Sequence, residues 1–213
     1  MARLSDASLR ADESGHDRTH PWFLSKTLTC ATIKTIYLTY FFMIRVAING
    51  FGRIGRTALK AGWGRKGLVF AAINDLSEPE VLAGLLKHDS VFGAWNHDVH
   101  FDKHHLIIDK KKIPVFAEKD PAALPWKKVK VDVVIESTGF FTKSVDAHKH
   151  IEAGARAVVI SAPSGDAPTF LMGVNHTKAK ASDRIVNNAS CTTNSVAPVA
   201  QIMNETLGIK KAM

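Results

Sequence analysis

Cysteine is scarce in this sequence: Cys30 and Cys191 are the only two among 213 residues. Two cysteines so far apart are not the pattern of a disulfide-stabilised secreted domain, so we expect a reducing, cytoplasmic compartment. Apolar runs near the start are short as well. The longest uncharged run there, Thr35–Ile44, cannot span a bilayer, and we expect no membrane partner.

Interleaved aromatic and basic residues are also lacking. The formal net charge is +8, and two short lysine runs lie at residues 110–112 and 127–130. Neither run alternates with aromatic residues as a strand-stacking surface does, so we do not expect nucleic acid as a partner. Solvated loops explain both runs more simply, and a basic protein also suits a dinucleotide and a phosphorylated substrate.

The first 42 residues differ from the rest of the chain. They are polar up to residue 20, then apolar and threonine-rich from Trp22 to Phe42, without a complete signal-peptide or transit-peptide pattern. Met43 begins a self-sufficient strand. We therefore expect residues 1–42 to be a non-native or accessory extension, and the folded part to begin at Met43.

A glycine fingerprint follows that strand. Ile44–Asn49 is an apolar, β-branched run, and Gly50, Gly52 and Gly55 stand at the spacing G-x-G-x-x-G before a helix expected from Arg56 to Ala61. The first glycine permits a tight turn, the second lets a pyrophosphate approach the backbone, and the third lets helix and strand pack closely. This pattern predicts a dinucleotide site.

The acidic residue that such a site needs is Asp75. It ends a second apolar strand, Leu68–Asn74, and lies 20 residues after Gly55. A carboxylate there accepts hydrogen bonds from the ribose hydroxyls and repels a 2′-phosphate, which favours NAD over NADP. The alternative is that the glycines only shape a turn and Asp75 only caps a loop. The register of strand, helix, strand and acid argues against it.

The remaining pattern alternates strands and helices. We expect a helix over Ser77–Lys87, capped by Ser77 and with Val81, Leu82, Leu85 and Leu86 on its apolar face, followed by short antiparallel strands within residues 98–116. A buried strand over 131–136, a helix over 144–152 and a strand over 157–161 complete a doubly wound, mostly parallel α/β sheet of Rossmann type. Ligands bind beyond the strand ends in such sheets, so Ser137 and Thr138 are cofactor candidates.

No metal site is expected. His104 and His105 are adjacent on a predicted strand, so they point to opposite faces, and no further ligands stand at metal spacing.

Cys191 is the candidate nucleophile. It precedes apolar residues at helical spacing, which we expect to form a buried helix face: Val196, Val199, Ala200 and Met203. The amides and dipole at a helix N-terminus favour a thiolate, and nearby hydroxyls could hold an oxyanion or a phosphate. The simpler alternative is a small apolar residue without chemistry.

Together these motifs resemble the phosphorylating, NAD-dependent glyceraldehyde-3-phosphate dehydrogenase family from Ile44 to Met213. The segments that carry the resemblance are Asn49–Arg56, Ala72–Asp75, Glu136–Gly139, Ser161–Pro168, Gly173–His176 and Ala189–Asn194. The resemblance implies NAD as cofactor, glyceraldehyde 3-phosphate and inorganic phosphate as substrates, 1,3-bisphosphoglycerate as product and a homotetramer for the full-length family.

The resemblance also implies a role for each matching residue. Cys191 would attack the aldehyde and carry a thioester, and Ser190 and Thr192 would flank the incoming phosphate. Arg53 and Ile54 would contact the pyrophosphate. The remaining cofactor contacts would be Asp75 to the adenosine ribose, Lys119 near the adenine, where the family usually has arginine, and Ser137 on the nicotinamide side.

The sequence departs from the family at its end, because the strand that would carry the catalytic histidine has barely begun at Met213. We therefore expect a Rossmann domain over residues 43–190, the truncated start of a catalytic domain over 191–213, and no dehydrogenase activity in this chain alone. Two other functions remain open. One is an erythrose-4-phosphate dehydrogenase, and the other is a non-catalytic module that binds nucleotide or RNA.

Overall fold

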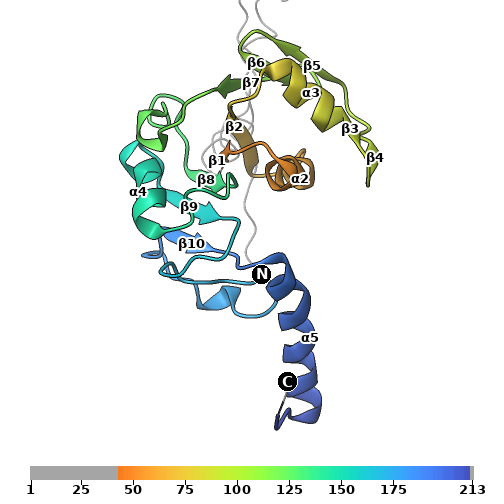
Figure 1. Cartoon of the computed structure of the whole chain (residues 1–213), viewed down its shortest axis with the longest axis vertical. Coiled ribbons are helices and arrows are strands. Elements are labelled where there is room, and N and C mark those ends of the chain that lie inside the picture. The colour runs from red at the N-terminus through yellow and green to blue at the C-terminus, as the bar shows by residue number, and fades with distance from the viewer. Residues whose placement is uncertain (1–42, 212–213) are drawn as a thin grey trace, which may run out of the picture. The chain divides into compact units, whose positions relative to one another are not determined.

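The structure, a computed structural model, describes residues 43–211. The extension predicted for residues 1–42 lies outside these residues. The described part contains one eight-stranded sheet with the strand order β10-β9-β8-β1-β2-β7-β6-β5, and a separate pair formed by β3 (His88–Asp89) and β4 (Gly93–Ala94). Figure 1 shows the sheet at the centre with helices beside it.

The centre of the sheet is parallel. β1 (Ile44–Asn49) lies between β2 (Leu68–Asn74) and β8 (Val133–Glu136) and runs parallel to both. β9 (Ala157–Ile160) and β10 (Ile185–Asn187) continue in the same direction. The chain thus builds outward from β1 on one side and then on the other, which confirms the predicted doubly wound α/β fold and places a ligand-binding crevice between β1 and β8.

The outer part of the sheet changes direction at β7 (Lys111–Phe116). This strand pairs parallel with β2 and antiparallel with β6 (His105–Ile108), which pairs antiparallel with β5 (Val99–Asp102). The short antiparallel strands predicted within residues 98–116 are therefore present, and they belong to the main sheet.

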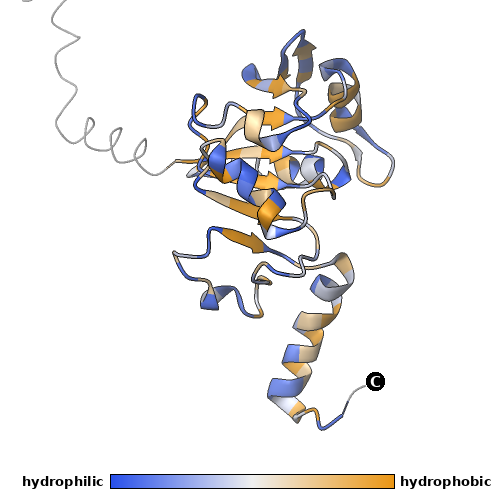
Figure 2. Cartoon of the chain, turned by 60° about the vertical axis from the view of Figure 1, so that its left-hand side comes forward, coloured by the Kyte–Doolittle hydropathy of each residue, from blue (hydrophilic) through white to orange (hydrophobic). Residues whose placement is uncertain are grey.

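Helices cover both faces of the sheet because its strands are apolar on both. Ile48 of β1 packs with Leu59 of α2 (Arg53–Gly62) and with α3 (Pro79–Lys87), while Ala47 faces Ala147 of α4 (Ser144–Glu152). Figure 2 shows the apolar strands between these more polar helices. Two separate cores result, one on each face.

The first helix starts earlier than predicted. α2 begins at Arg53, directly after its N-cap residue Gly52, and not at Arg56.

Two predictions for α3 are wrong. The helix begins at Pro79, and Ser77 is not its N-cap because Asp75 Oδ1 accepts the Ser77 amide hydrogen and holds that residue in a turn. The predicted apolar face is also only half correct. Leu82 and Leu86 are buried, but Val81 and Leu85 are exposed.

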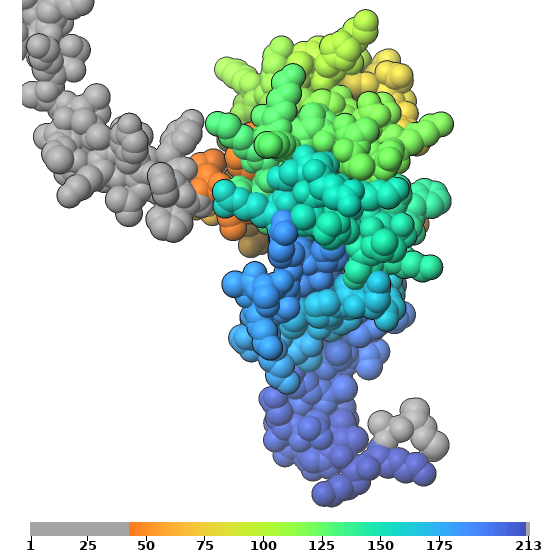
Figure 3. Space-filling model, turned by 90° about the vertical axis from the view of Figure 1, so that its left-hand side faces the viewer, coloured from red at the N-terminus to blue at the C-terminus, as the bar shows by residue number. Residues whose placement is uncertain are grey.

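The last two elements are β10, which the sequence patterns did not predict, and α5 (Cys191–Leu207). No residue of α5 is buried, so its predicted apolar face is present in sequence but uncovered within residues 43–211. Figure 3 shows α5, in dark blue, projecting from the rest of the described chain. Two 3-10 turns complete the structure, η2 (Pro121–Ala123) and η3 (His176–Lys178). Of the helices in this part of the chain, none combines the length and hydropathy needed to cross a membrane.

Candidate functional site: a dinucleotide cavity and an exposed thiol

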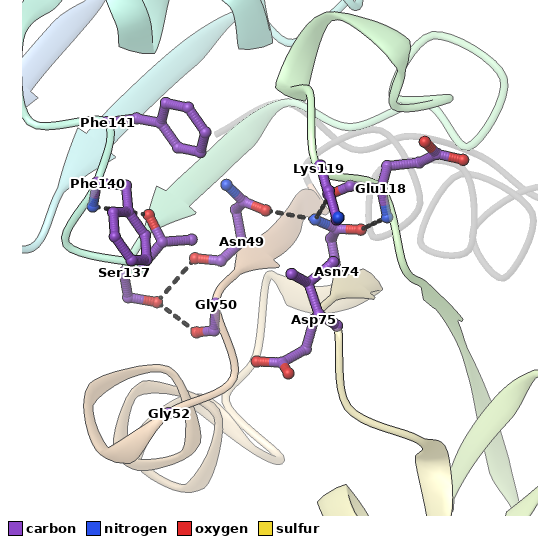
Figure 4. A pocket seen from close by; sticks show the side chains of 12 residues that line it. Asn49, Gly50, Gly52, Asn74, Asp75, Glu118, Lys119, Ser137, Phe140 and Phe141 are labelled. Carbon is purple, nitrogen blue, oxygen red and sulfur yellow. Dashed lines mark hydrogen bonds between the residues drawn. The ribbon is translucent and has the colours of Figure 1, made fainter.

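A cavity of about 600 Å³ opens at the carboxyl ends of β1, β2 and β8. It is lined by Asn49, Gly50, Gly52, Asn74, Asp75, Leu76, Glu118, Lys119, Ser137, Thr138, Phe140 and Phe141. Figure 4 shows these side chains around the glycine turn, with Phe140 and Phe141 on one side and Lys119 on the other. The cavity lies where a doubly wound sheet binds its ligand.

The glycine turn can exist only with glycine at two positions. Gly50 has φ +89°, and a Cβ there would lie 2.6 Å from the Thr138 amide nitrogen. At Gly55 a Cβ would lie 2.2 Å from the Gly50 carbonyl oxygen. The first glycine therefore allows β1 and the loop after β8 to meet, and the second allows α2 to approach the turn.

The turn leaves room for a phosphate group. A Cβ at Gly52 would meet no atom of the described chain within 4 Å, so the backbone there is open to a ligand. Gly52 is the N-cap of α2, and no side chain caps the helix. The first-turn amides, including those of Arg53 and Ile54, are thus available to a pyrophosphate.

Asp75 connects the end of β2 to the glycine turn. Its Oδ2 accepts the Phe51 amide at 2.7 Å and its Oδ1 the Ser77 amide at 2.9 Å. Figure 4 shows the carboxylate directed toward the turn. Each oxygen keeps acceptor capacity for a ribose hydroxyl, so this geometry fits the predicted role.

Ser137 belongs to the cavity wall that lies opposite Asp75 and Lys119. Its hydroxyl donates to the Gly50 carbonyl at 2.7 Å and lies 3.1 Å from the Asn49 carbonyl. The side chain therefore ties the end of β1 to the loop after β8, and its contact with the nicotinamide stays a prediction. Thr138, Phe140 and Phe141 complete this wall.

The predicted cofactor residues divide into two groups. Six of them line the cavity: Gly50, Gly52, Asp75, Lys119, Ser137 and Thr138. Arg53, Ile54 and Gly55 lie in the first turn of α2 and do not line it. Sequence reasoning missed the other lining residues, which are Asn49, Asn74, Leu76, Glu118, Phe140 and Phe141. An asparagine at the end of two adjacent strands was the signal that could have found the first two.

The candidate nucleophile lies at the first position of α5. Cys191 is exposed and follows Ala189, which has φ +61°, and Ser190, the N-cap of the helix. Ser190 Oγ accepts the Thr193 amide at 3.0 Å and lies 2.8 Å from Thr192 Oγ1. An exposed thiol beside free helix amides and two hydroxyls fits a nucleophile with a nearby anion site, and it does not fit a buried apolar residue.

No ionisable side chain is hydrogen-bonded to Cys191 within residues 43–211.

The histidines predicted to lie at the surface behave as expected, since His104 is exposed and His105 is half-buried and hydrogen-bonded to Asp102 at 2.7 Å. Over the same residues, no group of three or more potential ligands could hold a metal ion.

Fold and cavity together define a dinucleotide-binding domain of Rossmann type. Residues 44–144 match the family model described as glyceraldehyde 3-phosphate dehydrogenase, NAD binding domain. These residues therefore form an NAD-binding domain of the glyceraldehyde-3-phosphate dehydrogenase type, as the resemblance implied, and its cofactor is NAD.

Curated relatives extend the match beyond the NAD-binding domain. The chain is 48% identical over 172 residues to glyceraldehyde-3-phosphate dehydrogenase 1 of Saccharomyces cerevisiae, covering 80% of this chain and 52% of that protein. It is 48% identical to glyceraldehyde-3-phosphate dehydrogenase 1 of Bacillus subtilis, with 80% and 51% covered, and 49% identical to glyceraldehyde-3-phosphate dehydrogenase 2 of Kluyveromyces marxianus, with 80% and 52% covered. The chain thus spans about half the length of the curated relatives it matches.

Proposed function

We propose that this polypeptide supplies the NAD site and the nucleophile for the oxidative phosphorylation of glyceraldehyde 3-phosphate. The observation that carries the proposal is the cavity in which the glycine turn, Asp75 and the loop after β8 meet. The name of the matched relatives supports glyceraldehyde 3-phosphate as the substrate. The exposed Cys191 at the start of α5 supports a reaction through a cysteine nucleophile.

The chemistry of the chain's own residues follows from their positions. The Cys191 thiolate adds to the aldehyde carbon and forms a hemithioacetal whose oxygen takes up a proton. NAD bound in the cavity would supply the acceptor for the hydride of that carbon, and the hemithioacetal oxygen would release its proton as the thioester forms on Cys191. Inorganic phosphate beside Ser190 and Thr192 attacks the thioester, releasing the acyl phosphate 1,3-bisphosphoglycerate and the free thiolate.

We also propose that the 213 residues by themselves do not turn over substrate, as the resemblance implied. Within residues 43–211 Cys191 has no hydrogen-bonded base, and losing a general base typically slows a reaction by roughly 10²–10⁴-fold. A cytoplasmic location belongs to the same proposal, because the mechanism requires a reduced thiol at Cys191.

Calorimetric titration of the purified 213-residue chain with NAD and with NADP tests the cofactor site. We expect NAD to bind more tightly, and Asp75→Asn to weaken NAD about tenfold, because it removes an acceptor and leaves a backbone amide poorly paired. Absence of NAD binding would refute the proposal.

Two further assays test the chemistry. Incubation with NAD, phosphate and glyceraldehyde 3-phosphate is expected to give no NADH, and rapid turnover would contradict the proposed inactivity. Alkylation with iodoacetamide tests the thiol: an inert Cys191 would favour the non-catalytic nucleotide-binding module. In any longer protein that contains this sequence, preference for erythrose 4-phosphate over glyceraldehyde 3-phosphate would favour the alternative dehydrogenase.

A further inference from the structure

A buried network of polar side chains runs from the lining of the dinucleotide cavity into the core beneath it. Its members are Asn49, Asn74, Glu136 and His150, each at most 4% exposed, together with the fully buried Trp126. They come from the ends of β1, β2 and β8, from α4 and from the loop after η2. Buried polar groups are costly unless they are paired, so this arrangement requires an explanation beyond packing.

Trp126, at the end of this polar network furthest from the cavity, determines the tautomer of His150. Trp126 Nε1 can only donate, and it lies 2.9 Å from His150 Nδ1, which therefore accepts. The ring hydrogen is then on Nε2, which donates to Glu136 Oε2 at 3.0 Å. Trp126 thus directs the one ring donor of His150 at the carboxyl group of Glu136.

Glu136 in turn holds the loop after β8, which forms one wall of the cavity. Its Oε1 accepts the Thr138 amide at 2.8 Å and also the Thr138 hydroxyl. Thr138 Oγ1 in turn accepts the Phe140 amide at 3.1 Å. The loop that carries Thr138 and Phe140 at the cavity is therefore held by a carboxylate that does not itself line the cavity.

The same carboxylate constrains the opposite wall through two asparagines. Asn49 Nδ2 donates to Glu136 Oε2, and Asn74 Nδ2 donates to Asn49 Oδ1 at 2.7 Å. Asn74 also bonds both backbone groups of Glu118, with 2.9 Å to its carbonyl oxygen and 2.9 Å from its amide. Lys119 follows directly in sequence, so its position at the cavity depends on this end of the network (Figure 4).

We propose that His150 is a positioning residue for the dinucleotide. Acting through Glu136, it fixes the ends of β1, β2 and β8 and the loop after β7 relative to one another, so that NAD meets a pre-organised site. This inference rests on the proposal that the cavity binds NAD. Pre-organisation raises affinity by reducing the ordering that binding must supply, and His150 has this effect without touching the ligand.

Four substitutions separate positioning from general stability. His150→Leu keeps an apolar side chain in α4 but removes the donor to Glu136, and His150→Gln restores a donor at a similar reach. Ile108→Ala removes buried volume in β6, away from the cavity, and serves as a variant with comparable loss of stability. His148→Leu repeats the first exchange at an exposed position of the same helix.

Calorimetric titration with NAD and amide hydrogen exchange of the ligand-free 213-residue chain are the two measurements. We expect His150→Leu to weaken NAD about tenfold and to speed exchange at residues 137–141 and 118–119. His150→Gln is expected to recover most of the affinity. Ile108→Ala and His148→Leu are expected to bind NAD as the unmodified chain does.

The inference is overturned if His150→Leu binds NAD normally, or if Ile108→Ala weakens binding equally at the same loss of melting temperature. If even the unmodified chain fails to bind NAD, the proposed function fails, while the exchange data still decide whether His150 orders the walls. If His150→Leu does not fold, Glu136→Gln replaces it. An amide cannot accept all four hydrogen bonds of this carboxylate, so the same loss of NAD affinity and the same faster exchange are expected.

Discussion

The dinucleotide cavity and the first turn of α5 differ in the range of the contacts that form them. At the cavity, Asn49 and Glu136 are hydrogen-bonded although they are 87 residues apart in sequence. At the start of α5, the hydrogen bonds of Ser190 reach no further than Asn194, four residues along the chain. One site therefore depends on the assembled sheet and the other on local sequence, so each can be perturbed while the other stays intact.

The largest effect is expected at the glycine turn. In Gly55→Ala the new methyl group would overlap the Gly50 carbonyl, and we expect a loss of about 3 kcal/mol in the free energy of unfolding, together with weaker NAD binding. Denaturant titration and calorimetry measure the two effects. Alkylation of Cys191 is expected to be unchanged in the folded protein.

The matched control for that variant is Gly84→Ala in α3. A Cβ there meets nothing within 4 Å, and alanine is the better helix former, so stability is expected to rise by up to about 1 kcal/mol. Equal stability of both variants would show that the turn does not need glycine at residue 55.

A smaller effect is expected at the start of α5. Ser190→Ala removes the acceptor for the Thr193 amide, which typically costs about 1 kcal/mol of helix stability. The frayed turn would stabilise the thiolate less, so we expect alkylation of Cys191 to slow by roughly two- to fivefold with NAD affinity unchanged. Ser195→Ala, further along the same helix, is the control. A loss of NAD affinity in Ser190→Ala would show that the two sites are not independent.

A pH-dependent contribution is expected at α4, the helix that carries His150. The backbone N–H of Ser144, and next the Ser164 hydroxyl, hold the pKa of Asp166 below its usual value. A carboxyl group with a lowered folded-state pKa stabilises the fold above its unfolded value of about 3.9, and this contribution disappears as pH falls through the folded-state pKa.

We therefore expect Asp166→Asn to lower the melting temperature at neutral pH and to match the unmodified chain in strong acid. Thermal denaturation over a pH series measures the difference. Glu78→Gln is the control, since the Glu78 side chain does not cap α3. A difference between Asp166→Asn and the unmodified chain that is constant with pH would exclude the carboxylate as its cause.

The smallest change in stability is expected on the apolar face of α5. Val199 is 57% exposed, so Val199→Lys is expected to alter the free energy of unfolding by less than about 0.5 kcal/mol and to reduce self-association in size-exclusion chromatography. Val158→Lys, at a fully buried position of β9, is expected to abolish folding. Strong destabilisation by Val199→Lys would mean that α5 packs against other parts of the folded chain.

Local patterns predicted the central strands well. The bounds of β1, β2 and α4 agree with the predicted ones, because apolar runs and helical periodicity are properties of neighbouring residues. The pattern failed at Ser77, where the Asp75 carboxylate competes for the backbone amide, and at Val81 and Leu85, which point away from the sheet. It also missed β10, whose three residues are too short to give a periodic signal.

The cavity was only partly predictable. The glycine spacing and Asp75 identified the phosphate and ribose side, because those functions lie within one strand–turn–helix–strand unit. The hydrogen-bonded network that links Trp126 to Asn74 could not be predicted from sequence spacing, because its members come from five separate parts of the fold. The unusual feature in the sequence was polar residues ending apolar strands, such as Glu136 after Val133–Ile135.

Trp126 has a consequence for how the protein can be observed. Its indole is fully shielded from water and hydrogen-bonded to His150, while Trp63 and Trp95 form a half-exposed edge-to-face pair elsewhere in the fold. Its fluorescence therefore originates in a dry environment and depends on the position of the imidazole ring. The polypeptide thus contains an intrinsic optical reporter located under the floor of the cavity, and ligand-induced movements there can be followed in real time without an attached dye.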